Sequence, residues 1–261
     1  MAHTVYSNFV LANQVEDTYN SHLDLARFCT VDNSLTGTAG MTKKIHVYTA
    51  TNGTEKLAMG EGNSKDIEVS YAPHEYKILL AQNRFPYHDE EAMEDPMIVE
   101  VGMKHAAVDI FNTVNADILA EFNKATLTHT ASAPDFGCFA DAAALLNVER
   151  LEGIELFAFV NPKDMAKVRK ALKDELKYVE AYARQGYVGS VAGWNLYTNA
   201  IAAENTILGG TREAVTLFNK RGVEVEQDRD GDTRKNLIWS RKYYIAALTD
   251  ATKAVKITLG A

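Results

Sequence analysis

The stretch DPMIVEVGMKHAAVDIFNTVNADILAEFNKA, residues 95–125, decides the fold. Pro96 suits the first helical position, and the Asp95 carboxylate before it can cap the helix. Apolar side chains then recur three, four and seven residues apart, at Val101, Val108, Phe111, Val114, Ile118 and Phe122. The pattern predicts one helix over residues 96–125, about 43 Å long at 1.5 Å per residue. Helices of compact domains average about 12 residues, so this one is unusually long.

A hairpin with a polar tip is predicted before this helix. Two runs typical of strands, KIHVYT at 44–49 and IEVSY at 67–71, flank a segment rich in glycine, asparagine and serine. An arm of about 12–15 residues would reach roughly 40–50 Å. Because a lone two-stranded hairpin is marginal in water, we expect it to dock on a partner subunit. The candidate contact residues are Thr51, Asn52, Lys56, Met59, Gly60, Glu61 and Lys65.

The remaining segments differ in character. Residues 1–40 carry apolar side chains without a sustained period, which predicts an arm with one short helix near 18–28. Beyond residue 134, helices and strands alternate, which predicts an α/β or α+β domain from about residue 141. The expected elements are helices at 139–146 and 162–183, strands at 154–160, 206–210 and 255–259, a turn and strand at 189–198, a turn at 228–232 and a mixed run at 236–248.

The composition is that of a folded protein, with 46% hydrophobic residues and a net charge of −8. No run of 18 apolar residues exists, so no membrane span is expected. The N-terminus lacks the basic and apolar regions of a secretory signal, which favours cytoplasmic synthesis. The acidic balance argues against a dedicated nucleic-acid binder, although not against a container for DNA.

No group of residues indicates catalysis. Cys29 and Cys138 lie far apart without a zinc-type spacing, so two buried thiols are expected. The acidic run at 89–95 suits a helix N-terminus, and the aspartates at 228–232 lack the glycine and glutamate of a calcium loop. Phosphate-loop, serine-hydrolase and zinc-protease motifs are absent. We therefore expect no catalytic, cofactor-binding or metal-binding residues.

Four segments resemble the major capsid proteins of tailed bacteriophages, the phage and herpesvirus-type capsid fold. They are a strand entering Asn-Pro and a helix at 154–162, a glycine before a short strand at 191–196, a strand with a glycine at 206–209, and a long closing segment at 225–248. With the arm, hairpin and long helix, the similarity covers nearly the whole chain. The resemblance implies an α+β fold with an N-terminal arm (1–40), an extended β-hairpin loop (41–82), a peripheral domain with a spine helix (83–140 and 248–261), and an α/β axial domain (141–247).

The resemblance also implies a function. Such proteins assemble with copies of themselves, as hexamers and pentamers of an icosahedral shell, around double-stranded DNA that they enclose without sequence-specific binding. The expected location is the virion, after assembly in the host cytoplasm. Because no long scaffolding segment precedes the arm, a separate scaffolding protein is expected, together with a portal.

Two other functions remain open. An encapsulin-like nanocompartment shell would share the fold but hold enzyme cargo. A small-molecule enzyme built on residues 141–247 would need a pocket with convergent polar groups, and it would leave the hairpin and arm without a purpose.

Overall fold

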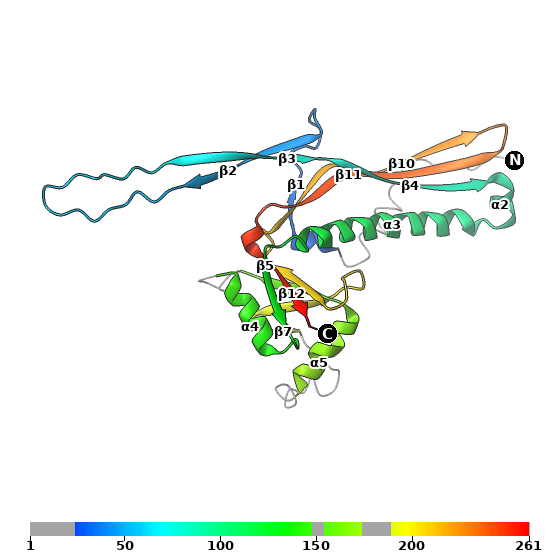
Figure 1. Cartoon of the computed structure of the whole chain (residues 1–261). Coiled ribbons are helices and arrows are strands. Elements are labelled where there is room, and N and C mark those ends of the chain that lie inside the picture. Colours follow the sequence, from blue (N-terminus) through cyan, green and yellow to red (C-terminus); the bar gives the residue numbers. More distant parts are fainter. Residues whose placement is uncertain (1–23, 148–153, 174–188, 261) are drawn as a thin grey trace.

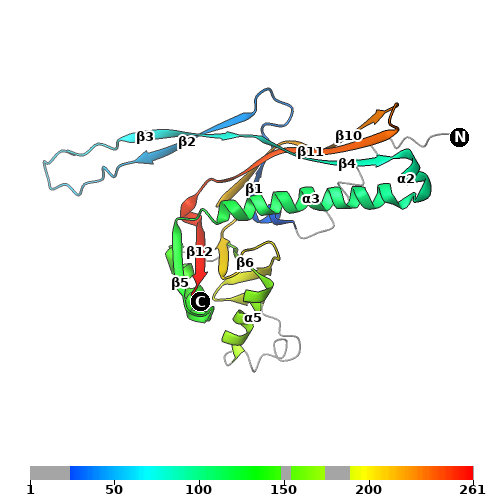
Figure 2. The same cartoon turned by 45° about the vertical axis from the view of Figure 1, so that its right-hand side comes forward.

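A computed structural model describes residues 24–147, 154–173 and 189–260. The protein has two lobes and one projecting hairpin (Figure 1). The first lobe holds a four-stranded sheet in the order β1-β10-β11-β4, and the second holds a six-stranded sheet in the order β5-β12-β9-β6-β8-β7. The hairpin is a separate two-stranded sheet, β2 (Thr42–Ala50) with β3 (Val69–Lys77), which extends away from both lobes (Figure 2).

The predicted long helix is confirmed as α3, Met97–Phe122. The helix begins one residue later than predicted, with Pro96 at the N-cap position. The Asp95 carboxylate before it accepts a hydrogen bond from the Met97 backbone N–H at 2.9 Å. A short helix that the sequence analysis did not predict, α2 (Asp89–Glu94), precedes it. Its acidic residues form two ion pairs, Asp89 with Arg229 near the end of β10 (Val215–Asp230) at 2.6 Å and Glu90 with Arg234 in the turn that follows this strand at 2.9 Å.

The predicted apolar stripe of α3 is confirmed only in its second half. Phe111, Val114, Ile118 and Phe122 are buried, but Val101 is 46% exposed and Val108 is half-buried. The first half instead buries Val99, Met103, Ala107 and Ile110. Residues two apart on a helix point about 200° away from each other, so Val101 faces nearly opposite Val99. Strands cover this half of the helix on one side, and that side selects the buried stripe.

The four-stranded sheet lies along α3 (Figure 1). Its strands are β1 (Thr30–Asp32), β4 (Leu79–His88), β10 (Val215–Asp230) and β11 (Lys235–Leu248). The helix approaches β4 closely at Gly102, where an added Cβ would lie 2.4 Å from the Phe85 ring. The Tyr244 hydroxyl on β11 donates to the Asp117 carboxylate on α3 at 2.6 Å. These contacts fix the sheet against the helix.

The six-stranded sheet is covered on both faces. Its strands are β5 (Leu127–Ala131), β6 (Leu156–Val160), β7 (Ser190–Val191), β8 (Trp194–Thr198), β9 (Thr206–Gly210) and β12 (Ala254–Leu259), and its helices are α4 (Phe136–Leu145) and α5 (Pro162–Ala171). On β6, Phe157 and Phe159 pack towards Phe122 of α3, whereas Leu156, Ala158 and Val160 pack towards α4 and α5. All five β6 residues are therefore buried, as two-sided cover requires.

Other predicted elements fare differently. Strand 206–210 is confirmed as β9, and strand 255–259 lies in β12. The prediction at 228–248 is wrong in detail, because β10 continues through Asp230 and residues 235–248 form one strand, β11. The helix expected at 162–183 is described only in part, and this part contains α5. Most of the helix expected near 18–28 lies outside the described residues, and the described part forms the 3-10 turn Leu25–Phe28.

Sheet pairing groups the elements differently from the predicted domain ranges. Strand β10 and all but the last residue of β11 lie in the range 141–247, yet β10 pairs with β11 and β11 pairs with β4 beside α3. Strand β12, inside 248–261, pairs with β5 and β9 in the other lobe. The long closing segment therefore returns to the spine helix before the chain crosses to its last strand.

Candidate intersubunit interface

Among the described residues, the hairpin contacts the rest of the chain at its base. Ile45 and Tyr76 pack against a cluster that includes Phe218 and Ile78, with the Tyr76 and Phe218 rings stacked at 5.2 Å. Beyond Ile45, every residue of β2 is exposed, and so is every residue of β3 before Tyr76. The far part of the hairpin therefore lacks the cover that a two-stranded sheet needs in water.

An ion pair also anchors the base. The Lys43 ammonium lies 3.3 Å from the Asp32 carboxylate and donates to the Ser34 hydroxyl at 2.6 Å. Partial burial would raise the pKa of Asp32, but hydrogen bonds from Ser34 and the contact with Lys43 outweigh it and hold this pKa below its ordinary value. The ionised carboxylate is thus the form that the fold stabilises.

One face of the hairpin carries exposed rings. Tyr48 and Tyr71 are opposite each other in the β2–β3 register, with ring centroids 6.1 Å apart and exposures of 67% and 64%. The His46 ring meets the Tyr71 ring edge-on at 5.1 Å, and Val69 on the same face is 64% exposed. Apolar and aromatic side chains gathered on an uncovered face indicate a contact surface.

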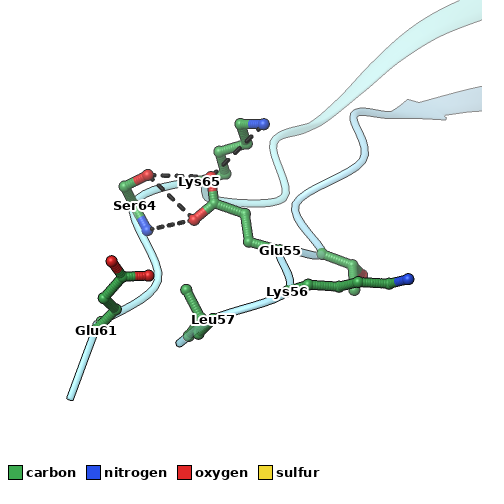
Figure 3. A pocket seen from close by; sticks show the side chains of 8 residues that line it. Glu55, Lys56, Leu57, Glu61, Ser64 and Lys65 are labelled. Atoms are coloured by element: carbon green, nitrogen blue, oxygen red, sulfur yellow. Dashed lines mark hydrogen bonds and ion pairs between the residues drawn. The ribbon is translucent and has the colours of Figure 1, made fainter. Parts of the chain in front are cut away.

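The tip has its own polar framework. The Glu55 carboxylate accepts hydrogen bonds from the Ser64 backbone N–H and hydroxyl at 3.0 Å each, and it lies 3.6 Å from the Lys65 ammonium. Figure 3 shows Ser64 and Lys65 directed at this carboxylate, while Lys56 points away from it. The hydrogen bond from the Ser64 backbone is the main cause that lowers the pKa of Glu55. This network shapes the tip before any partner binds.

The structure places all seven predicted contact residues in or at the tip, but in two roles. Thr51, Glu61 and Lys65 belong to the internal framework. The Thr51 N–H donates to the Glu68 carbonyl, and the Thr51 hydroxyl accepts a hydrogen bond from the Glu68 N–H. The Glu61 carboxylate accepts a hydrogen bond from the Ala58 backbone N–H at 3.1 Å. The others are directed at solvent or shape the turn: Asn52 and Lys56 are exposed, Met59 is fully exposed, and Gly60 has a φ of +91°.

The sequence analysis missed the ring-bearing face on the strands. Its signal was present as the period-two spacing of His46 and Tyr48 and the tyrosine at position 71. Side chains two apart share a face of a strand, but only the register shows that Tyr71 lies opposite Tyr48.

The rest of the described chain offers little chemistry. No cluster of three potential metal ligands occurs among the described residues. In the same part of the chain, no helix combines the length and apolar character needed to cross a bilayer. Surface hollows lie at the hairpin tip, beside Thr49, Ala50, Val69 and Ser70 on the strands, and between β4 and α3.

Both cysteines are buried and unpaired, as expected. Burial and, to a lesser extent, the Asp24 carboxylate raise the pKa of Cys29 to about 12. Burial and nearby aspartates raise the pKa of Cys138 to about 11. A thiol held in this form is a poor nucleophile.

Comparison with known proteins reveals clear relatives. No protein-family model matches the chain. The major capsid protein of Staphylococcus phage phiMR11 is 30% identical over 262 residues, which cover 96% of this chain and 92% of that protein.

Solved structures show the same fold at low identity. The capsid of a native GTA particle matches with a TM-score of 0.71 at 11% identity, covering 100% of this chain and 93% of that chain. The structure of Mycobacterium phage Che8 matches at 0.65 and 18%, with coverage of 98% and 97%. The virus-like particle from Pyrococcus furiosus matches at 0.65 and 13%, with coverage of 97% and 100%. The predicted α+β architecture is confirmed by these likenesses.

Proposed function

The chain belongs to the family of phage major capsid proteins, and from this premise we propose that it assembles as hexamers and pentamers into an icosahedral shell. It is a structural protein of the virion. The shell encloses double-stranded DNA without reading its sequence. A net charge of −8 suits this role, because strong binding to DNA depends on lysine and arginine contacts with phosphates.

The uncovered hairpin carries this proposal. Two nine-residue strands extend about 30 Å at roughly 3.3 Å per residue, and the tip lies beyond them. Tyr48, Tyr71 and Val69 stay more than 60% exposed on this arm. Their apolar surface gains burial only from another molecule, and in a shell of identical subunits that molecule is a second copy.

The seven tip residues named above are proposed as part of the same contact surface. The internal network around Glu55 holds the tip in shape, which lowers the conformational entropy lost on docking. The outward-facing Lys56 and Met59 are then available to a neighbouring subunit.

We propose further partners and a division of the chain. A separate scaffolding protein and a portal take part in assembly, which occurs in the host cytoplasm, and the chain has no enzymatic activity of its own. Residues 1–40 act as the arm and 41–82 as the extended loop. The pairing of β10 and β11 beside α3 supports drawing the axial domain shorter than 141–247, with both strands in the peripheral domain.

Negative-stain electron microscopy tests the proposal. The full chain is overexpressed alone and together with the scaffolding gene of the same phage. Closed shells, tubes or six-fold rings are the expected products. A uniform small particle under both conditions, at concentrations where shells of related phages form, would overturn it.

A cargo-loaded compartment is the second candidate, because the Pyrococcus furiosus particle shares the fold over nearly the whole chain. The contents of particles purified from infected cells separate the two functions. Nuclease-protected DNA of genome length supports the phage shell. A single co-purifying enzyme without DNA would favour the compartment.

A further inference from the structure

The hydrogen-bond pattern of the hairpin shows which backbone groups face outward. The Thr51 N–H donates to the Glu68 carbonyl at 3.0 Å, and the Ile78 N–H donates to the Met41 carbonyl at 2.7 Å. Both pairs belong to the single β2–β3 register, one at each end. Hydrogen-bonded and non-hydrogen-bonded pairs alternate in an antiparallel ladder. Even-numbered residues of β2 and odd-numbered residues of β3 therefore turn their N–H and C=O groups away from the partner strand.

The two outer edges of the hairpin are not equivalent. On β3 the outward position opposite His46 is Pro73, which has no N–H. A proline there interrupts the row of donors and protects an edge against strand addition. On β2 the outward positions Lys44, His46, Tyr48 and Ala50 all keep their N–H groups. No strand within the described residues pairs with this edge of β2.

The lysines of β2 do not block its edge. Exposed lysines often protect an edge strand because a second strand would bring like charges together. Here the Lys44 ammonium lies 2.6 Å from Glu75 of the same hairpin, and Lys43 pairs with Asp32 at the base. Both charges have a partner within the chain, so two copies of β2 can approach each other without unpaired lysines.

We propose that the outer edge of β2 pairs antiparallel with the same edge of a second copy, which joins two hairpins into a four-stranded sheet β3-β2-β2-β3. This inference rests on the proposed function, since it names the surface through which shell subunits meet. A contact of β2 with β2 is isologous, so one surface patch serves both molecules around a two-fold axis.

The sequence of β2 is self-complementary in one register. With Val47 opposite Val47 of the second copy, all four outward residues from 44 to 50 find a hydrogen-bonding partner. Tyr48 of each molecule then lies opposite His46 of the other. The row of rings that already joins Tyr71, Tyr48 and His46 continues across the junction. Aromatic cross-strand pairs of this kind stabilise sheets.

Disulfide trapping tests the register. In the proposed register, the two Val47 residues form a non-hydrogen-bonded pair with Cα atoms about 4.5 Å apart, so cysteines at this position could form a disulfide. Ala72 is the matched control, because it is exposed, lies opposite Val47 on β3 and would sit about 14 Å from its counterpart across three strand spacings. The buried native cysteines give little background.

The expected result is a disulfide-linked dimer in oxidised Val47→Cys particles, about tenfold more abundant than in Ala72→Cys particles. Equal dimer in both variants, or no dimer in Val47→Cys particles that assemble normally, would overturn the pairing while leaving the shell function intact. Absence of particles from the wild-type chain would instead count against the proposed function.

A proline pair tests the edge independently of oxidation. Tyr48→Pro removes an outward N–H from β2, and Tyr71→Pro removes the opposite outward N–H from β3, without loss of a β2–β3 hydrogen bond in either case. Both variants lose one exposed ring, and a thermal melt checks that both fold. We expect loss of closed shells only for Tyr48→Pro. An equal effect of the two substitutions would refute the assignment of the β2 edge.

Discussion

Deleting residues 51–65 should separate folding from assembly. The deletion leaves Ala50 and Val69, which are paired in the hairpin, joined by Asp66, Ile67 and Glu68. Three-residue connections are common in β-hairpins, so the shortened chain can close the turn. Strands β2 and β3 keep their full register, and only the tip is lost.

The expected cost in stability is small because the deleted side chains are almost all exposed. Leu57 is 46% exposed and Met59 is fully exposed, so their removal exposes little new apolar surface. Changes at exposed positions stay within about 0.5 kcal/mol, which corresponds to a Tm shift of about 1–2 °C for a chain of this size. For comparison, Phe122→Ala removes a fully buried ring that meets Phe157 and Phe159 at 5.7 and 5.8 Å. That substitution should cost about 3–5 kcal/mol, or roughly 10 °C.

Thermal unfolding followed by circular dichroism, together with electron microscopy, measures both effects. The deletion variant should melt like the wild type and form no closed shells. Phe122→Ala provides the stability control, with a lowered Tm. Normal shells from the deletion variant would refute the role of the tip, and a Tm loss as large as that of Phe122→Ala would show that the tip supports its own subunit.

Three further outcomes are expected. Phe111→Asp should abolish cooperative unfolding, because a buried unpaired charge costs several kcal/mol. Val101→Asp, at an exposed position of the same helix, should melt within about 2 °C of the wild type. Equal melting curves for the two variants would contradict the assigned helix face. Cys29 and Cys138 should not react with a thiol reagent at pH 8 in the native protein and should both react after unfolding, because burial raises their pKa values. Rapid labelling of either thiol in the native protein would contradict that burial. Because the pKa of Asp32 is lower in the folded protein than the value of about 3.9 for an unfolded chain, its ionised carboxylate stabilises the fold at pH values above 3.9, and this contribution is lost as the pH falls through the folded pKa. In urea unfolding, the decrease in the free energy of unfolding from pH 6 to pH 3 should therefore be smaller for Asp32→Asn than for the wild type.

Local patterns were sufficient for several elements. The existence and start of α3 follow from Asp95, Pro96 and the apolar spacing of three and four residues, all of which act within one or two turns, whereas its end lies three residues before the predicted one, at Phe122. Strand β9, Thr206–Gly210, matches its predicted range because it is a short apolar run bounded by turn residues.

Longer strands could not be delimited in this way. Strand β11 alternates half-buried and buried residues from Lys235 to Ala246. It buries polar residues such as Asn236, Ser240 and Lys242. In the sequence alone, such polar residues suggest that the strand is interrupted. Here β10, β4 and α3 surround the strand and keep it continuous. Pairing with β10 and β4 and packing against α3 therefore determine the length of β11.

The candidate surface shows the same division. Glycine, asparagine and serine content placed the polar tip between two strands, and the marginal stability of a lone hairpin indicated a partner. The sequence could not assign Thr51 and Lys65 to the internal framework and Lys56 to the outside, because those roles depend on how the tip folds back on Glu55.

The amino-acid sequence by itself determined the order of the elements, the long helix and the existence of a projecting hairpin, since each depends on contacts between residues close in the chain. Only the tertiary structure decided that Val99 and not Val101 faces the core. It also decided that Pro73, which has no N–H, takes an outward position on β3, while no described strand pairs with the outer edge of β2. The first depends on which side of α3 the sheet covers, and the second on the register of two strands. Both are set by packing between segments distant in sequence, which no local pattern encodes.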